Sequence, residues 1–424
     1  MAGTVLEYLS EYGGETFGEL PFHDVDSLIL SQFCYLKFDG LVPGPEERKD
    51  YVSLSQLREH PDFDRLFSDI RYEKPNRLLF ERMADSRRFG ELKLNYYENI
   101  IEHDTEVQFS AVTFLLPNGV IYVAFRGTDE NMVGWKEDFN MTFMDVVPAQ
   151  ILAVKYLNEV ARTFEGDFLV GGHSKGGNLS VYSAMHCEEE VRQRIRLIYS
   201  MDGPGFRREV LSQGAYLEIR DRIVKLLPQS SLVGMLMEID DRYEVIKSNS
   251  FGLTQHNPYT WEIEGAEFVR EGEIDPRAKA IDLAVNEWIL GQDEENRKRF
   301  VDTVYQIFDS CEANTLIEFA SGRSRNLNKV LSTLRGQDEE TIRMLRRIIR
   351  NLVDLGAMHM KAEFLTEAES KRRRQSARSQ ELWNSLTEAG ARTLERIKKE
   401  SLLKSEKHLK KGSEGKETGN GENI

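Results

Sequence analysis

Cysteine is scarce in this chain: its 424 residues include three, Cys34, Cys187 and Cys311, which lie far apart. An odd and scattered set does not form the disulfide framework of a small secreted protein, and it favours a reducing compartment. No apolar run approaches the length that spans a bilayer, and the first residues lack the basic and apolar regions of a secretion signal. We therefore expect a cytoplasmic protein without a transmembrane helix.

The chain also lacks the common cofactor motifs. It has no zinc-ligand spacing, no H-E-x-x-H pair and no dinucleotide fingerprint. A phosphate-binding loop is excluded around residues 171–177, because the lysine there follows the serine instead of preceding it. We expect neither a metal nor an organic cofactor.

Positive charge is in the minority, since 56 Lys and Arg stand against 71 Asp and Glu, a net charge of −15. Residues 1–356 carry this acidic excess, whereas residues 357–424 hold more basic than acidic side chains. An acidic body disfavours nucleic acid as a partner, because phosphate binding needs a concentrated basic face. The hydrophobic share of 40% is ordinary for a globular protein, and the length suffices for one large core with appendages.

The most informative segment is Gly171-Gly172-His173-Ser174-Lys175-Gly176-Gly177, which contains a G-x-S-x-G motif directly after the apolar run 168–170. In that setting the serine lies at the tip of a tight strand-to-helix turn, and small flanking residues let strand and helix approach each other. Residues 178–185 indicate the start of a helix, whose N-terminal amides would face charge developing near Ser174. The segment predicts a nucleophilic serine; a plain Gly/Ser turn is the alternative.

Strand and helix patterns alternate around this segment. Apolar residues over 107–116 and 120–125 indicate two strands, and Asn118-Gly119 between them is a strong hairpin signal. The other elements expected here are a helix over 151–160 and strands over 195–199, 223–227 and 243–247. This alternation predicts the α/β class, with a mostly parallel central sheet flanked by helices.

Both ends of the chain indicate helices. Apolar spacing within residues 4–45 predicts an N-terminal helix, with Asp24 or Asp26 available as its N-cap. Residues 276–360 predict a helical extension built from amphipathic segments.

The C-terminal residues 361–424 form the third predicted region. Residues 361–411 indicate one long charged helix with a basic run at 371–374, and residues 412–424 are polar enough to be disordered. Such a helix can pack its thin apolar stripe on the body or on a second copy of the chain. The basic run leaves peripheral membrane contact open, although interspersed acidic residues count against it.

Three motifs together resemble the class 3 lipases of the α/β-hydrolase fold: Phe125-Arg126-Gly127-Thr128-Asp129, the W-x-x-D-F segment 135–139, and the elbow continued to Leu179. The chain looks closest to a bacterial group of lipase-related domains of unknown function. The resemblance covers roughly residues 20–265. It implies a lipase-like domain over residues 1–275, followed by the helical extension and the tail.

The resemblance also implies site residues. In such lipases the R-G-T turn contributes to the oxyanion hole, which points to Thr128, and the second amide comes from the residue after the nucleophile, Lys175. Residues 131–146, rich in Met and aromatic side chains, correspond to the lid-like segment of these lipases. Within this segment we expect Met132 and Trp135 to bind substrate.

Acyl transfer needs a base for Ser174 and a carboxylate that holds this base in the right tautomer. Hydrolases of this fold run in the order Ser, acid, His, and among eight histidines His256 is the candidate in that order. His173 lies inside the elbow and is expected to point away from Ser174. A hairpin histidine without a base role is the alternative for His256.

The acid departs from the lipase pattern. Class 3 lipases carry an Asp in the stretch that corresponds to residues 228–234, which here offers serines instead. Asp202, at the end of the preceding predicted strand, is our first choice, and a turn-capping role is its alternative. The further candidates are Glu238, Asp240 and Asp241.

The side chain of Lys175 has two interpretations. It can add positive charge at the mouth of a pocket and favour anionic esters, or it can point along the helix surface into solvent, which we prefer.

Two functions follow from these residues. The leading hypothesis is a serine hydrolase of lipase, phospholipase or esterase type that acts on an acyl ester or lipid through an acyl-enzyme at Ser174. The alternative is a weakly active or inactive hydrolase fold that serves as a binding or scaffold module and uses its helical C-terminal region.

Overall fold

The computed structural model describes residues 2–47, 50–68, 70–102, 107–128, 141, 146–237, 240, 242–276, 278–279, 303, 339 and 342–343. All of these belong to the first of two units, Met1–Ile348. The second unit, Ile349–Ile424, lies outside the described residues, and so do the predicted charged helix and tail and nearly all of the predicted helical extension.

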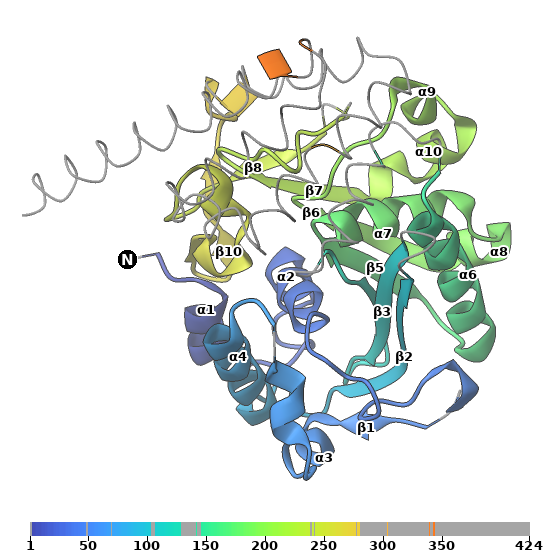
Figure 1. Ribbon diagram of the computed structural model, residues 1–424. Coiled ribbons are helices and arrows are strands. Elements are labelled where there is room, and N and C mark those ends of the chain that lie inside the picture. Colours follow the sequence, from blue (N-terminus) through green and yellow to red (C-terminus); the bar gives the residue numbers. More distant parts are fainter. Residues whose placement is uncertain are drawn as a thin grey trace, which may run out of the picture. The chain divides into compact units, whose positions relative to one another are not determined.

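A nine-stranded mixed sheet runs through the described part of the chain, in the order β1-β2-β3-β4-β5-β6-β7-β8-β11 (Figure 1). Its strands are β1 (Val52–Ser53), β2 (Lys93–Glu102), β3 (Val107–Leu115), β4 (Ile121–Phe125), β5 (Phe168–His173), β6 (Ile195–Met201), β7 (Ile223–Pro228), β8 (Glu244–Ile246) and β11 (Arg270–Glu271). A separate pair joins β9 (Ile263–Glu264) to β10 (Glu267–Phe268).

The strands from β4 to β8 pair in parallel, whereas those from β1 to β4 and the pair β8–β11 are antiparallel. The predicted parallel pairing is right for β4 to β8, and the flanks add the antiparallel strands β1, β2 and β11, which the sequence did not indicate. Short connections explain the antiparallel pairs β2–β3 and β3–β4, because parallel pairs need a longer crossover. The strands β1 and β11 reach their antiparallel partners through long segments of chain. The predicted hairpin is confirmed in β3 and β4, where Gly119 adopts φ 82° in the turn.

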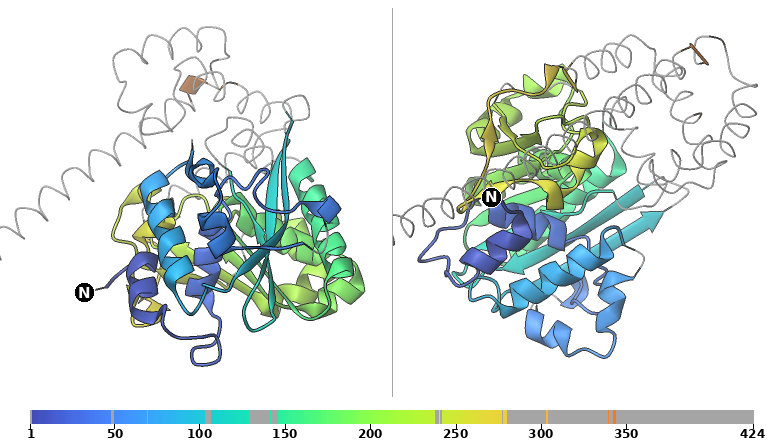
Figure 2. Two further views of the ribbon diagram at one scale, coloured as in Figure 1. Left: turned by 90° about the horizontal axis from the view of Figure 1, so that it is seen from below. Right: turned by 90° about the vertical axis from the view of Figure 1, so that its left-hand side faces the viewer.

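Helices cover both faces of the sheet (Figure 1; Figure 2). The blue helices α1 (Val5–Tyr12), α2 (Asp24–Phe33) and α4 (Glu73–Asp85) lie on one side, and the green helices α6 (Pro148–Thr163), α7 (Lys175–His186) and α8 (Glu189–Arg194) on the other. The shorter helices are α3 (Leu54–Arg58), α9 (Arg208–Leu211), α10 (Gly214–Ile219) and the 3-10 turns η1 (Pro45–Glu47), η2 (Phe63–Phe67), η3 (Arg220–Arg222), η4 (Gly252–His256) and η5 (Pro258–Thr260).

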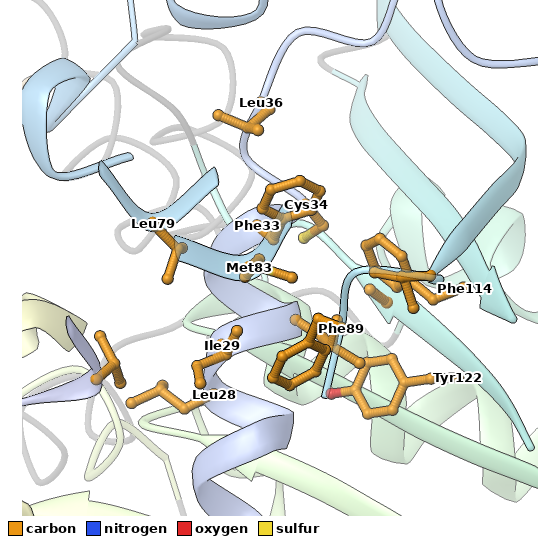
Figure 3. Close-up of a cluster of buried hydrophobic side chains, with 14 of the residues drawn as sticks. Leu28, Ile29, Phe33, Cys34, Leu36, Leu79, Met83, Phe89, Phe114 and Tyr122 are labelled. Carbon is orange, nitrogen blue, oxygen red and sulfur yellow. The ribbon is translucent and has the colours of Figure 1, made fainter. Parts of the chain in front are cut away.

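Alternating side chains of the central strands belong to two separate hydrophobic cores, one on each face of the sheet. On β3, Val112 and Phe114 join the core under α2 and α4, whereas Phe109 and Ala111 join the core under α6 and α7. Figure 3 shows the first core, in which Leu28, Ile29 and Phe33 of α2 gather with Leu79 and Met83 of α4 and with Phe114 and Tyr122 of the sheet. Burial of both sheet faces explains why these strands are apolar along their whole length.

Tyr122 shows how the sheet and α2 are fitted to each other. Its hydroxyl oxygen lies 2.7 Å from Ser27 Oγ and 3.1 Å from Ser31 Oγ, so this buried phenol is hydrogen-bonded. A Cβ atom at Gly171 would lie 2.0 Å from the same oxygen. The glycine that opens the elbow segment therefore makes room for Tyr122.

The N-terminal region contains two helices, α1 and α2, where the sequence predicted one. The N-cap of α2 is His23, not Asp24 or Asp26, and its side chain accepts a hydrogen bond from the amide of Val25. Asp26 occupies the third helical position and closes a capping box on His23. The helix α4 and the strand β2 are further elements that the sequence analysis did not predict.

Asp26 is engaged by Arg88, and both side chains are fully buried. Arg88 Nε lies 2.7 Å from Asp26 Oδ1, and Arg88 Nη2 lies 2.5 Å from Asp26 Oδ2. The guanidinium also donates to the carbonyl of Leu20 at 2.8 Å and stacks over the ring of Phe17 at 4.2 Å. This bidentate ion pair connects the segment after α4 to the start of α2.

No helix in the described part of the chain is both long and apolar enough to cross a membrane.

We expect Arg88→Met to lower the free energy of unfolding by about 3–5 kcal/mol, because it leaves the Asp26 carboxylate buried without its partner. Urea unfolding followed by circular dichroism measures this. The control is Arg65→Met, since Arg65 and its partner Asp62, at 3.5 Å, are both more than half exposed and should contribute less than about 1 kcal/mol. Equal losses for the two variants would contradict a structural role for the buried pair.

Candidate active site

Ser174 lies at the junction of β5 and α7, with φ 60° and ψ −132°. A non-glycine residue adopts this conformation only when its surroundings impose it. Two backbone hydrogen bonds of 2.9 Å hold it: Ser174 N donates to the carbonyl of Met201 on β6, and Gly177 N donates to the carbonyl of Ser174. The elbow predicted from the sequence is thus anchored to the neighbouring strand.

The glycines on either side of Ser174 allow backbone to pack on backbone. A Cβ atom at Gly176 would lie 2.0 Å from the carbonyl oxygen of Phe125, and one at Gly172 would lie 2.5 Å from the same oxygen. The end of β4 therefore touches both arms of the elbow. Any side chain at these two positions would separate β4 from α7.

The Arg126-Gly127-Thr128 turn lies against the serine. A Cβ atom at Gly127 would lie 3.0 Å from the Cβ atom of Ser174 and 2.1 Å from the hydroxyl of Tyr35. Thr128 follows directly along the chain and is the last residue described before a gap. The predicted substrate-binding residues Met132 and Trp135 lie outside the described residues.

His256 and Asp202 are brought together across 54 positions of sequence. Nδ1 of His256 lies 2.6 Å from Oδ2 of Asp202, and the side chain of Asp202 is 2% exposed while that of His256 is 20% exposed. Among the described residues no hydrogen bond joins the hydroxyl of Ser174 to His256. Such contacts are often long in a free enzyme and shorten when substrate binds.

Asp202 follows directly after β6 and adopts φ 50°. Its amide donates to the carbonyl of Leu226 on β7 at 2.9 Å. The hydroxyl of Ser231 and the amide of Gly234, the latter at 3.2 Å, both donate to Oδ1. Residues 228–234, in which the sequence lacks the expected acid, therefore supply hydrogen bonds that hold the carboxylate of Asp202.

The alternative carboxylate Asp240 is engaged elsewhere. Arg220 binds both of its oxygens, with Nη2 2.7 Å from Oδ1, and the hydroxyl of Tyr216 lies 3.3 Å from Oδ2. Glu238 and Asp241 lie outside the described residues. Of the acids considered from the sequence, Asp202 is the one that the described structure brings to His256.

His173 lies beside the site, and the sequence analysis assigned it no contact there. Its Nε2 lies 2.9 Å from the backbone carbonyl oxygen of His256, and its Nδ1 lies 3.2 Å from the hydroxyl of Tyr35. A carbonyl oxygen only accepts, so Nε2 must carry the proton and Nδ1 is the acceptor. Burial, and then the charge of His256, lower the pKa of His173 well below its usual value. A neutral His173 thus holds the loop of His256.

The side chain of Lys175 is buried, with 1% exposure, and Nζ donates to the backbone carbonyl of Gln108 at 2.9 Å. The preferred interpretation, a lysine pointing into solvent, is therefore wrong. The helix α7 is packed between the sheet and the helix α6, so its first side chain has no path to the surface and turns to a strand carbonyl instead.

Lys225 is a further cation near the carboxylate. Its Nζ donates to the carbonyl of Gly203 at 2.6 Å, one residue beyond Asp202. Loss of hydration lowers the pKa of Lys225 to about 8, and the charge of Asp202 partly opposes this. The described residues include no group of three His, Cys, Asp or Glu side chains placed to hold a metal ion.

A strained serine at a helix N-terminus beside a buried carboxylate–imidazole pair is an arrangement capable of acyl transfer. A family model described as Mbeg1-like matches residues 83–306, a range that contains Ser174, Asp202 and His256. None of the curated proteins compared with the chain matches it.

Similar solved structures include two lipases. The native Rhizomucor miehei lipase propeptide complex is 16% identical over 38% of this chain and 58% of that chain, with a TM-score of 0.28. The crystal structure of M37 lipase is 12% identical over 50% of this chain and 69% of that chain, with a TM-score of 0.30. The chain thus spans less than two thirds of the length of the Rhizomucor lipase chain that it matches.

The lowered pKa of His173 predicts a pH dependence of stability. The unfolded histidine takes up a proton near pH 6.5 and the folded one only at lower pH, so unfolding binds a proton and stability falls as the pH drops below about 6.5. The slope is at most about 1.4 kcal/mol per pH unit for this one group. We expect His173→Gln to show a shallower decline than the wild type in urea unfolding between pH 6.5 and 5; parallel curves would contradict the assignment.

Proposed function

The chain belongs to the Mbeg1-like family, a lipase-like family, and on that premise we propose that it is a serine hydrolase of the α/β-hydrolase fold that cleaves carboxyl esters through an acyl-enzyme at Ser174. The observation that carries the proposal is the 2.6 Å contact between His256 Nδ1 and the buried carboxylate of Asp202. It lies at the same sheet edge as Ser174, whose backbone is bonded to Met201, the residue before Asp202.

In the first half of the proposed reaction, Ser174 Oγ attacks the carbonyl carbon of the ester while His256 Nε2 takes the hydroxyl proton. The tetrahedral intermediate then collapses, the bond to the alcohol oxygen breaks, and His256 returns its proton to the leaving alcohol. In the second half, His256 takes a proton from water as the water attacks the acyl carbon. The bond from that carbon to Ser174 Oγ then breaks, His256 returns the proton to Oγ, and the carboxylic acid leaves.

Asp202 has an electrostatic role in this scheme. Its Oδ2 accepts the Nδ1 proton of His256, which keeps the lone pair of Nε2 on the side away from the carboxylate. The carboxylate also stabilises the imidazolium that forms during each proton transfer. Its near-complete burial strengthens that interaction, because little water screens it.

For the oxyanion we propose the backbone amides of Thr128 and Lys175. Two observations support this: a Cβ atom at Gly127, next to Thr128, would lie 3.0 Å from the Cβ atom of Ser174, and Lys175 is the first residue of α7. Amides at a helix N-terminus point outward and carry partial positive charge, which suits an oxygen that becomes negative.

The proposed substrates are acylglycerols, phospholipids or smaller carboxyl esters. We propose Met132 and Trp135 as residues that contact the acyl chain, in a lid-like segment over 131–146. Contact with a membrane surface, or with a second copy of the chain, is proposed for the charged region 361–411. A helical C-terminal extension over 276–360 completes the proposed organisation.

We expect a fluorophosphonate probe to label the wild-type protein once, at Ser174, because only an activated serine displaces the fluoride and takes up the phosphonyl group. Intact mass and peptide mapping identify the site. Ser174→Ala should abolish labelling, and Ser230→Ala, a nearby serine outside the proposed reaction, should not change it. A well-folded wild type that stays unlabelled, with mild detergent also present, would argue for the scaffold alternative.

We expect Asp202→Asn to lower the turnover of a short-chain ester by about 10⁴-fold, because the amide would favour the wrong tautomer of His256. The matched control is Asp240→Asn, which should retain turnover but lose thermal stability, since Asp240 binds Arg220. Initial rates with a chromogenic ester and melting temperatures separate the two effects. If Asp240→Asn were the slow variant, Asp202 would not be the acid.

A further inference from the structure

The turn that follows β7 is built around the carboxylate of Asp202. Ser231 is 2% exposed, and its amide donates to the carbonyl of Pro228 at 2.8 Å, which closes the turn. The hydroxyl of Ser231 donates to Oδ1 of Asp202 and accepts the amide of Gly234 at 3.0 Å. That amide is shared, because it also lies 3.2 Å from Oδ1.

Gly234 is required in this turn for lack of space. A Cβ atom there would lie 2.4 Å from Asp202 Oδ1, 2.9 Å from Ser231 Oγ and 2.3 Å from a methyl group of Leu227. The turn therefore encloses one oxygen of the carboxylate, while the other oxygen faces His256. Close packing and hydrogen bonding thus act on the same atom.

We propose that Ser231 is a positioning residue of the proposed hydrolase: with the amide of Gly234 it fixes the Asp202 carboxylate so that Oδ2 faces Nδ1 of His256. The inference rests on the proposed function and deepens it, because it names how the acid is held. A carboxylate on a single side-chain bond can rotate, and donors on one oxygen remove that freedom. The hydroxyl of Ser231 also donates to the negative charge on Oδ1, so its removal leaves that charge less compensated beside His256.

The charged and titratable groups around the pair come from three elements. Lys225 on β7 interacts with Asp202, and Arg71, before α4, interacts with His173. The ring centroid of His173, on β5, lies 4.5 Å from that of His256. Every variant below retains these groups. Changes in pH dependence therefore report the hydroxyl of Ser231.

The test compares Ser231→Ala with Ser231→Thr in the full-length protein. We expect Ser231→Ala to react with the fluorophosphonate probe about tenfold more slowly, which corresponds to loss of one charge-assisted hydrogen bond. The pH at which the rate reaches half its plateau on the acid side should rise by about half a unit. Ser231→Thr keeps the hydroxyl and should restore most of the rate and the wild-type midpoint.

Two further variants serve as controls. Ser230→Ala removes the neighbouring serine, whose amide and not its hydroxyl is bonded to Gln255 among the described residues, and should behave as the wild type. Ser231→Val has the shape of Ser231→Thr without its hydroxyl. If Ser231→Ala does not fold, the comparison of the Val and Thr variants therefore tests the role of the hydroxyl. A wild-type rate and midpoint in Ser231→Ala, or equal rates for the Val and Thr variants, would overturn the proposal. So would a slower Ser231→Ala with an unchanged midpoint, because that pattern indicates packing alone.

A readout that does not depend on turnover separates this inference from the proposed function. The Nδ1 proton of a histidine bonded to a carboxylate gives a far-downfield proton resonance, which should shift or broaden in Ser231→Ala and stay in place in Ser230→Ala. If the fluorophosphonate probe does not label the wild type but the resonance shifts in Ser231→Ala, the hydrolase is refuted and the contact of Ser231 is retained. If the probe labels the wild type but the resonance does not shift in Ser231→Ala, the role of Ser231 is refuted.

Discussion

The close approach of β4 to the elbow is the constraint on which the site depends. The carbonyl oxygen of Phe125 would lie 2.5 Å from a Cβ atom at Gly172 and 2.0 Å from one at Gly176, so strand, turn and helix pack backbone on backbone. From there the strand ends are linked laterally: Ser174 N bonds Met201, and Asp202 N bonds Leu226. These links bring Gly127, Ser174, Asp202 and the turn of Ser231 to one edge of the sheet, where the carboxyl ends of parallel strands gather.

A second set of contacts reaches the site from the N-terminal layer. Tyr35 follows α2 and bonds His173, which in turn holds the backbone carbonyl of His256. The position of α2 itself depends on the buried pair of Arg88 with Asp26 and on the bonds of Tyr122 to two serines of the helix. Residues from the N-terminal part of the chain thus help to hold the loop of the proposed base through hydrogen bonds. This role explains why polar groups are retained in an otherwise apolar core.

Local patterns predicted the elements that are strongly periodic or punctuated. The β3–β4 hairpin and the strands β5, β6, β7 and β8 lie where apolar runs and turn residues indicate them. Predictions failed where the deciding contact is distant in sequence. The one helix predicted near the N-terminus is two, the second of which begins after the capping residue His23, and Lys175 bonds a strand carbonyl instead of pointing into solvent. The helix α4 and the strand β2 were not predicted at all.

The sequence by itself determined the elbow, the R-G-T turn and the short set of histidines and acids from which a base and its partner could come. These follow from local chemistry, since glycine spacing and strand periodicity act within a few residues. Only the tertiary structure decided which carboxylate meets His256, because Asp202 and Asp240 are the same residue type and differ in their partners: Asp202 lies against His256 of η4, and Asp240 is bound by Arg220 of η3. The same holds for His173 and Ser231, whose hydrogen-bond partners lie 83 and 29 residues away in the sequence.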